Sequence, residues 1–169
     1  MTTPRDPTKG KRRGKGKRKR REGEVVELVT VDLGPLHRDV ESHLAGLSPR
    51  LAHTHHTCGI EAYLDMLEKE EEEEEGALFG LIASDMAPKA TGNRSLDASR
   101  AEALFDLAAA TLPYLAPRGV FLCKIFRNGS ENYARDTLRD SGLLAPRFVK
   151  PPSSHRHSKE IFLLAHAPP

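Results

Sequence analysis

The sequence is poor in cysteine, in aromatic residues and in long apolar runs. Its only cysteines, Cys58 and Cys123, are too few and too far apart for a disulfide framework, which indicates a reducing, intracellular compartment. No apolar run reaches the roughly 18 residues that a membrane-spanning helix requires, and no apolar signal-peptide core follows the basic N-terminus. We therefore expect no membrane association and a location in the mitochondrion or the cytoplasm, with the basic N-terminus leaving the nucleus as an alternative.

Charge is distributed very unevenly along the chain. The first 21 positions hold 11 of the 26 basic residues and 1 of the 24 acidic residues. The remainder of the chain therefore holds 15 basic and 23 acidic residues. A basic arm of charge +10 thus precedes an acidic body of charge −8. Residues 1–23 hold no apolar side chain after Met1, so we expect a disordered arm. It serves either as a solubilising tail or as an attachment to nucleic-acid phosphates, and its glycine spacing does not fit a phosphate-binding loop.

From residue 24 onward, apolar β-branched runs alternate with helical patterns. Strands are predicted at residues 25–33, 77–84, 120–126, 147–150 and 161–165, and helices at 36–47, 59–67, 97–115 and 131–140. The run at 25–33 has the composition of a buried parallel strand, and Asp97 is the expected cap of the third helix. The last two strands are joined by a polar loop and form an antiparallel hairpin. The order predicts one α/β domain over residues 24–169 with a mostly parallel sheet.

Two biased segments interrupt this pattern. His53, His55, His56 and Cys58 crowd one stretch, but no second pair of metal ligands stands elsewhere, so we expect a polar loop and no metal site. Residues 68–75 are almost entirely glutamate, and their mutual repulsion favours a solvated helix end or an acidic surface insertion over a functional acidic cluster.

Three charged residues are expected at one edge of the sheet. Asp85 ends a predicted parallel strand, and Lys124 lies inside an apolar one. Glu160 opens the last strand, which runs antiparallel and therefore begins where parallel strands end, the edge at which such sheets bind ligands. An ammonium group in apolar surroundings must be paired or partly neutralised. Lys124 is thus a candidate base or electrostatic clamp, unless it is simply a lysine at the sheet edge that reaches water.

Three segments in order resemble the FtsJ/RrmJ-type ribosomal RNA ribose 2′-O-methyltransferases. Residues 84–94, SDMAPKATGNR, resemble that family's SDMAPN-x-TG-x-R segment, and residues 115–124, LAPRGVFLCK, resemble its L-x-PGG-x-F-x-x-K segment. Residues 149–165 are similar to its closing KP-x-xSR-x-x-S-x-E-hydrophobic segment. The resemblance implies a Rossmann-like methyltransferase sheet that uses S-adenosylmethionine to methylate the 2′-hydroxyl of a uridine in large-subunit rRNA. A cap or a tRNA ribose would require the same chemistry.

The resemblance also implies roles for individual residues. Lys124 matches the lysine that accepts the proton, Asp85 the aspartate beside the methyl donor, and Glu160 the third member of the catalytic set. Asp32, at the end of the first predicted strand, resembles an acid that contacts the cofactor. Metal is not part of this chemistry.

The sequence also departs from the family's pattern. The family's fold begins with a strand and a glycine-rich turn that holds the methionine end of the cofactor, preceded by a further catalytic lysine, and neither is found here. Arg118 replaces a glycine and Lys89 an asparagine. We therefore expect a sheet that is incomplete at its N-terminal strand, and a chain that binds cofactor weakly or not at all by itself. The alternative reading is a non-catalytic RNA-binding remnant that uses the basic arm.

Overall fold

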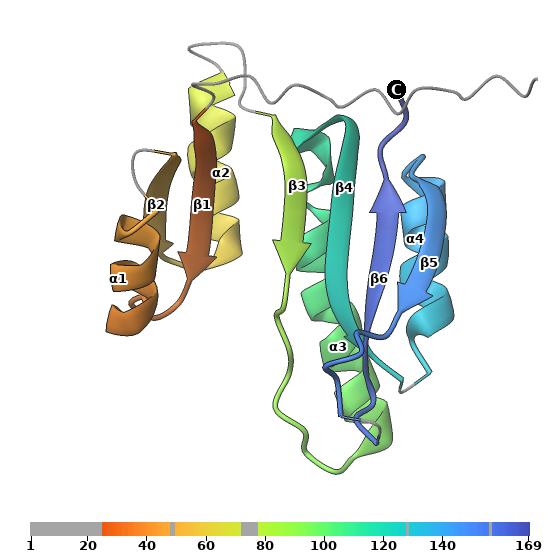
Figure 1. Cartoon of the computed structure of the whole chain (residues 1–169). Helices are drawn as coiled ribbons and strands as arrows, with labels where there is room; N and C mark the ends of the chain where they lie inside the picture. Colours follow the sequence, from red (N-terminus) through yellow and green to blue (C-terminus); the bar gives the residue numbers. More distant parts are fainter. Residues whose placement is uncertain (1–24, 48–49, 72–77, 128, 156) are drawn as a thin grey trace, which may run out of the picture. The chain divides into compact units, whose positions relative to one another are not determined.

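The computed structural model describes the chain except for residues 1–24, 48–49, 72–77, 128 and 156 (Figure 1). The described residues form two compact units. One contains residues 37–54 and the described residues before Thr30, and the other contains residues 30–36 and 55–169. The predicted basic arm and the second half of the glutamate run lie outside the described residues. None of the described helices is long and apolar enough to cross a membrane.

A small sheet is formed by the first two strands. Strand β1 (Val26–Asp32) is followed by helix α1 (Arg38–Ala45) and strand β2 (Leu51–Thr57). The amide of Val26 donates to the carbonyl of Arg50, and Thr30 Oγ1 lies 2.9 Å from His55 Nδ1. These contacts advance in the same direction along both strands, which therefore run parallel. The prediction that β1 is buried was wrong, since Val26 is 60% exposed.

The histidine-rich segment was predicted as a loop, and this was also wrong. His53, His55 and His56 lie in β2. The ring of His55 bridges two groups of the neighbouring segment, Thr30 Oγ1 and, at 3.1 Å, the carbonyl oxygen of Gly34. A polar side chain can occupy a strand when its ring nitrogens are satisfied in this way. No group of three or more potential metal ligands occurs among the residues that the structure describes.

The larger sheet has four strands in the order β3-β4-β6-β5. They are β3 (Phe79–Ser84), β4 (Leu115–Phe126), β5 (Leu144–Val149) and β6 (Glu160–His166). Strands β3 and β4 are parallel, whereas β6 is antiparallel to both β4 and β5. The predicted α/β fold and its C-terminal antiparallel hairpin are confirmed, but only one of the three pairings in this sheet is parallel. Among the described residues, β3 is an edge strand of this sheet.

Helices cover one face of this sheet. Helix α3 (Arg94–Ala109) and helix α4 (Glu131–Asp140) contact it, and both lie behind it in Figure 1. On that covered face the alternate residues of β4 and β6 pack with the buried apolar residues of the helices and form the core. Each fully buried large side chain there contributes roughly 1.5–3 kcal/mol to stability. The core includes Phe105, Phe121, Cys123, Ile125, Leu138, Ile161, Leu163 and Ala165.

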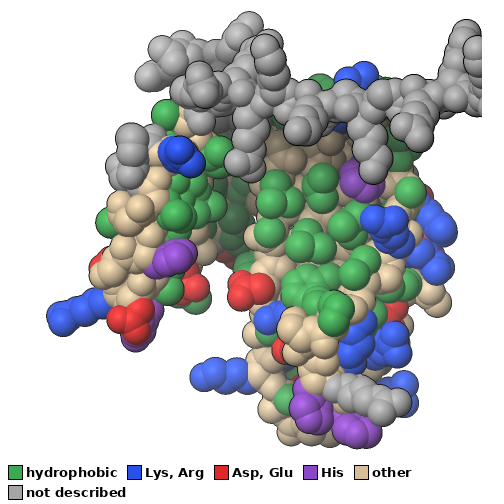
Figure 2. Space-filling model, viewed as in Figure 1, with side chains coloured by type: hydrophobic (Ala, Val, Ile, Leu, Met, Phe, Trp, Pro, Cys, Tyr) green, Lys and Arg blue, Asp and Glu red, His purple; other side chains and the backbone are tan. Residues whose placement is uncertain are grey.

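The opposite face of the sheet is apolar but not buried. Register pairing places the other alternate residues together on it, and Figure 2 shows hydrophobic side chains gathered over these strands. Leu81 is 60% exposed, although β3 has the nearly continuous apolar sequence of a strand from a sheet interior. We call this surface the open face. It comprises Leu81, Ala83, Val120, Leu122, Lys124, Phe126, Phe162 and Leu164.

Three helices begin or end differently from the sequence prediction. Helix α1 is shorter than the predicted 36–47, and α3 ends at Ala109 and not at residue 115. The N-cap of α3 is Asn93, whose side chain accepts from the amide of Leu96, and the predicted cap Asp97 lies in the first turn. Helix α2 (Ile60–Glu71) extends beyond the predicted residue 67 and takes in the first glutamates of the acidic run. Helix α4 has its predicted bounds, with Gly142 at φ +81° after it.

Adjacent residues near the start of β4 should respond oppositely to substitution. Arg118 has φ +62°, where a side chain costs about 1 kcal/mol, so Arg118→Gly should raise the free energy of unfolding by up to about 1 kcal/mol. A Cβ on Gly119 would lie 2.6 Å from the carbonyl oxygen of Ala116, so Gly119→Ala should lower it by about 1–3 kcal/mol. Urea unfolding of both variants measures this, and destabilisation by Arg118→Gly would contradict the strain argument.

Candidate functional site

The sheet register brings three charged residues to neighbouring positions. Ser84 pairs with Cys123, so Asp85, the next residue, follows beside Lys124 at the carboxyl end of β3. Lys124 pairs with Phe162 of β6, and Glu160 lies two residues before Phe162 in β6. Diagonal neighbours of this kind have Cβ atoms roughly 7 Å apart. Because β6 runs antiparallel to β4, its first residue lies at the same end of the sheet as the last residues of β3 and β4.

Lys124 stands in apolar surroundings at the edge of the open face. It is half-buried, with Phe162 across the strand pair and Leu122 and Phe126 on either side in its own strand. Asp85 is exposed and Glu160 is half-buried. Among the described residues no ion pair joins Lys124 to either carboxylate. The three groups therefore lie at neighbouring register positions at one end of the sheet, and none is ion-paired with another.

A local network fixes the position of Glu160. Ser158 Oγ donates to Glu160 Oε2 at 3.3 Å and accepts from the backbone amide of Glu160 at 3.1 Å. Lys150 Nζ donates to the carbonyl oxygen of Ser158 at 2.6 Å, which joins the two ends of the loop between β5 and β6. The sequence analysis assigned no role to Lys150 or Ser158. Both match named positions of the closing KP-x-xSR-x-x-S-x-E segment, and that match was the signal that could have identified them.

The segment after β3 is fastened to α3 by Asp97. Its carboxylate accepts from the hydroxyl of Thr91 at 2.6 Å, from the amide of Thr91 at 2.8 Å and from the amide of Gly92 at 3.2 Å. The hydroxyl of Thr91 is the largest cause of the lowered pKa of Asp97, followed by its amide. Gly92 has φ +84°, a conformation that favours glycine. Asp97 therefore holds the turn at the far end of the loop that begins with Asp85.

Asp32 ends β1, as predicted. Its Oδ1 accepts from the amide of Gly34 at 2.8 Å, and the residue is exposed. This turn leaves the second carboxylate oxygen available to a hydroxyl group, which fits the ribose end of a nucleoside cofactor. No glycine-rich turn that could hold the opposite end is found among the described residues. The donors present therefore fit only part of the cofactor that the resemblance implies.

Two other features lie away from these residues. A cavity of about 450 Å³ opens at the other end of the sheet, lined by residues such as Leu112, Leu115 and Ala167. Cys123 is on the covered face, where burial raises the pKa of its thiol to about 11. Such a thiol is a core residue and not a nucleophile.

Comparison with known proteins connects the chain to methyltransferases. A family model described as FtsJ-like methyltransferase matches residues 17–167. Proteins named ribosomal RNA large subunit methyltransferase E are similar. The one from Bartonella henselae is 41% identical over 86 residues, covering 50% of this chain and 34% of the relative. The one from Desulforapulum autotrophicum is 33% identical over 144 residues, covering 84% of this chain and 64% of the relative.

A third relative of the same name, from Granulibacter bethesdensis, is 36% identical over 91 residues. The chain spans only 39% of the length of that relative. Among solved structures, a ribosomal RNA methyltransferase from Plasmodium falciparum superposes with a TM-score of 0.57 at 18% identity. That match covers 83% of this chain and 71% of the other. It supports the Rossmann-like methyltransferase fold.

The role of Asp97 can be tested through pH. Because the folded-state pKa of Asp97 lies below its ordinary value of 3.8, its carboxylate stabilises the folded chain above that pH. The stabilisation is lost as the pH falls through the lowered pKa. The urea midpoints of wild type and Asp97→Asn should thus differ at neutral pH and converge as the pH falls through the lowered pKa of Asp97. Asp65→Asn, an exposed acid on α2, is the control, and a pH-independent difference for Asp97→Asn would contradict the assignment.

Proposed function

The chain belongs to the FtsJ-like methyltransferase family, and from this premise we propose that it transfers the methyl group of S-adenosylmethionine to a ribose 2′-hydroxyl of ribosomal RNA. The observation that carries the proposal is the placement of Asp85, Lys124 and Glu160 at neighbouring register positions where β3 and β4 end and β6 begins. The names of the curated relatives support large-subunit rRNA as the substrate. A uridine is the proposed acceptor.

The reaction requires alignment and a proton acceptor. S-adenosylmethionine supplies a methyl group that its sulfonium charge already activates. A ribose hydroxyl is a poor nucleophile until its proton is accepted by a group within hydrogen-bond reach. Lys124 is proposed for that position, with Asp85 on the side of the methyl donor and Glu160 on the other side. Asp32 is the proposed contact for the cofactor's ribose.

Lys124 has two possible roles at the acceptor hydroxyl. As a neutral amine it accepts the proton at Nζ. A protonated amine instead donates a hydrogen bond to the hydroxyl oxygen and orients it. Both roles are compatible with the register, which places Lys124 opposite Phe162 and near the carboxylates of Asp85 and Glu160. Arginine separates the roles because its guanidinium stays protonated.

The experiment is methyl transfer from labelled S-adenosylmethionine to large-subunit rRNA. Millimolar cofactor compensates for the weak binding expected of the chain by itself. Wild type should transfer label, and Lys124→Arg should reduce the rate by about 100-fold or more across the pH range if Lys124 is the base. Retained activity of Lys124→Arg with an unchanged pH profile would remove the general-base role. Absence of transfer by wild type would contradict the proposed function.

Arg38→Gln, on α1 and exposed, is the matched control for the loss of a basic side chain. Its rate should equal that of wild type. Thermal unfolding of each variant establishes that a lost rate does not reflect lost folding.

A further inference from the structure

Positive charge outside the basic arm is concentrated in one segment. Residues 127–160 contain seven basic and four acidic residues, a net charge of +3, whereas residues 22–126 contain 8 and 19, a net charge of −11. The segment includes helix α4, which holds two arginines and three acids, and strand β5, which holds one arginine and no acid; Figure 2 shows lysine and arginine side chains gathered over that side of the sheet. The mechanism above uses none of them.

Two arginines of α4 lie on the flank nearest β5. Ala134 and Leu138 are buried against the sheet, and Tyr133 OH donates to Asp106 of α3 at 2.8 Å, so the flank of Tyr133 faces α3. Residues 135 and 139 are displaced by about 100° to the opposite side of the buried stripe. Because α4 packs against β5 and β6, Arg135 and Arg139 lie where the sheet ends at β5.

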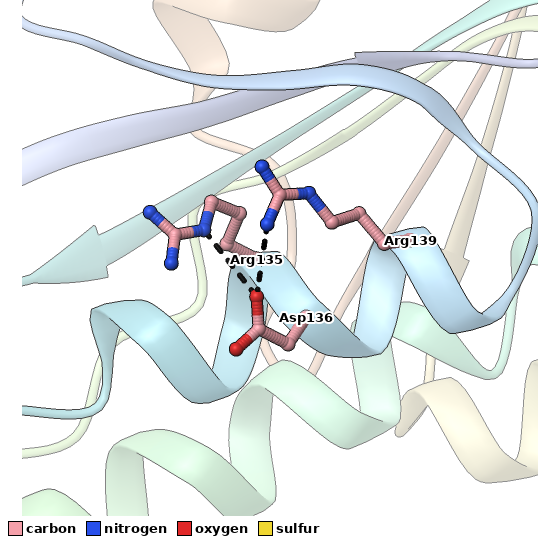
Figure 3. Close-up of polar contacts among 3 residues, drawn as sticks. All are labelled: Arg135, Asp136 and Arg139. Atoms are coloured by element: carbon pink, nitrogen blue, oxygen red, sulfur yellow. Dashed lines mark hydrogen bonds and ion pairs between the residues drawn. The ribbon is translucent and has the colours of Figure 1, made fainter.

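One carboxylate serves both arginines. Arg135 Nε and Arg139 Nη1 lie 3.4 and 3.3 Å from the same oxygen, Asp136 Oδ1 (Figure 3). The cluster therefore keeps a net positive charge, and the Arg139 side chain is 55% exposed. Asp136 holds the guanidinium groups in place while most of their N–H donors remain available to an anion.

Strand β5 adds a third arginine and an aromatic ring. Arg147 is exposed, pairs with Leu164 and so shares the open face with Lys124, and no described carboxylate forms an ion pair with it. Phe148, the next residue, is 38% exposed on the side of α4. Arginines that bind phosphate bidentately, beside a ring on which a base can stack, are the combination that binds single-stranded nucleic acid.

We propose that Arg135, Arg139, Arg147 and Phe148 form an RNA-binding edge that holds the substrate strand next to the ribose at Lys124. The inference rests on the proposed function. Lys124 and Arg147 are separated by two strand spacings and two residues along the strand, on the order of 12 Å, a span of a few nucleotides. The RNA-binding edge thus receives phosphates that neighbour the methylated nucleotide.

The test is fluorescence anisotropy of the full chain with a labelled single-stranded RNA oligonucleotide at several salt concentrations. The variant with Arg135→Gln, Arg139→Gln and Arg147→Gln should bind at least 10-fold more weakly at low salt. Its slope of log affinity against log salt should fall by about 2, because each phosphate contact contributes about 0.7 for a single strand. Phe148→Leu should weaken binding by about 5-fold or more without changing the slope.

The matched control replaces three exposed arginines elsewhere, Arg38→Gln, Arg50→Gln and Arg100→Gln, with the same change in net charge. Its affinity should stay within about 2-fold of wild type. Equal losses in the two triple variants, or no loss in the first, would overturn the proposal, as would equal competition by polyglutamate, which would mark a general polyanion surface.

The outcome is separable from that of the proposed function. RNA affinity and methyl transfer are measured separately for wild type and for the triple arginine variant. RNA binding that depends on the edge in a chain without transfer would leave the edge standing and the proposed function refuted. Methyl transfer by a chain whose RNA affinity does not change when the three arginines are replaced would support the proposed function and refute the RNA-binding edge.

Discussion

The pairing of β4 with its two neighbours determines where the chemistry of this chain can occur. Parallel pairing of β3 with β4 ends at Ser84 and Cys123, and antiparallel pairing with β6 begins at Phe126 and Glu160. A shift of one residue in either register would turn Lys124 toward the helices and Cys123 toward solvent. The buried face, with Phe121, Ile161 and Leu163, prevents such a shift because it would bury a charge and expose the core.

Among the described residues, helices pack on only one face of the same sheet. Helices α3 and α4 cover the face that carries the core, whereas the open face keeps apolar side chains such as Leu81 and Leu122 partly in water. Strand β3 has the composition of an interior strand and stands at an edge of the described sheet. Asp32 is the proposed contact for one end of a nucleoside cofactor, and the described residues contain no glycine-rich turn for the other end. The proposed site is thus more complete for the methyl acceptor than for the methyl donor.

Sequence alone predicted the parts of the fold in which local and tertiary preferences agree. Helix α4 has its predicted bounds because a polar amphipathic pattern ends at a glycine with positive φ. Strand β2 was missed because its histidines and threonines carry no apolar alternation, and their stability comes from partners such as Thr30 that only the folded chain supplies. Asp97 was misplaced because it bonds backward to Thr91 instead of capping α3.

The neighbouring positions of Asp85, Lys124 and Glu160 followed from strand direction, whereas the support of Glu160 by Ser158 and the alignment of the arginines with β5 required coordinates. The most direct measurement of the account is the position of the transferred methyl group in the RNA. Alkaline hydrolysis needs a free 2′-hydroxyl, so ribose methylation leaves the label in alkali-resistant dinucleotides. The account predicts that the wild-type chain yields label in alkali-resistant dinucleotides. Label recovered in mononucleotides would indicate base methylation and would contradict the account.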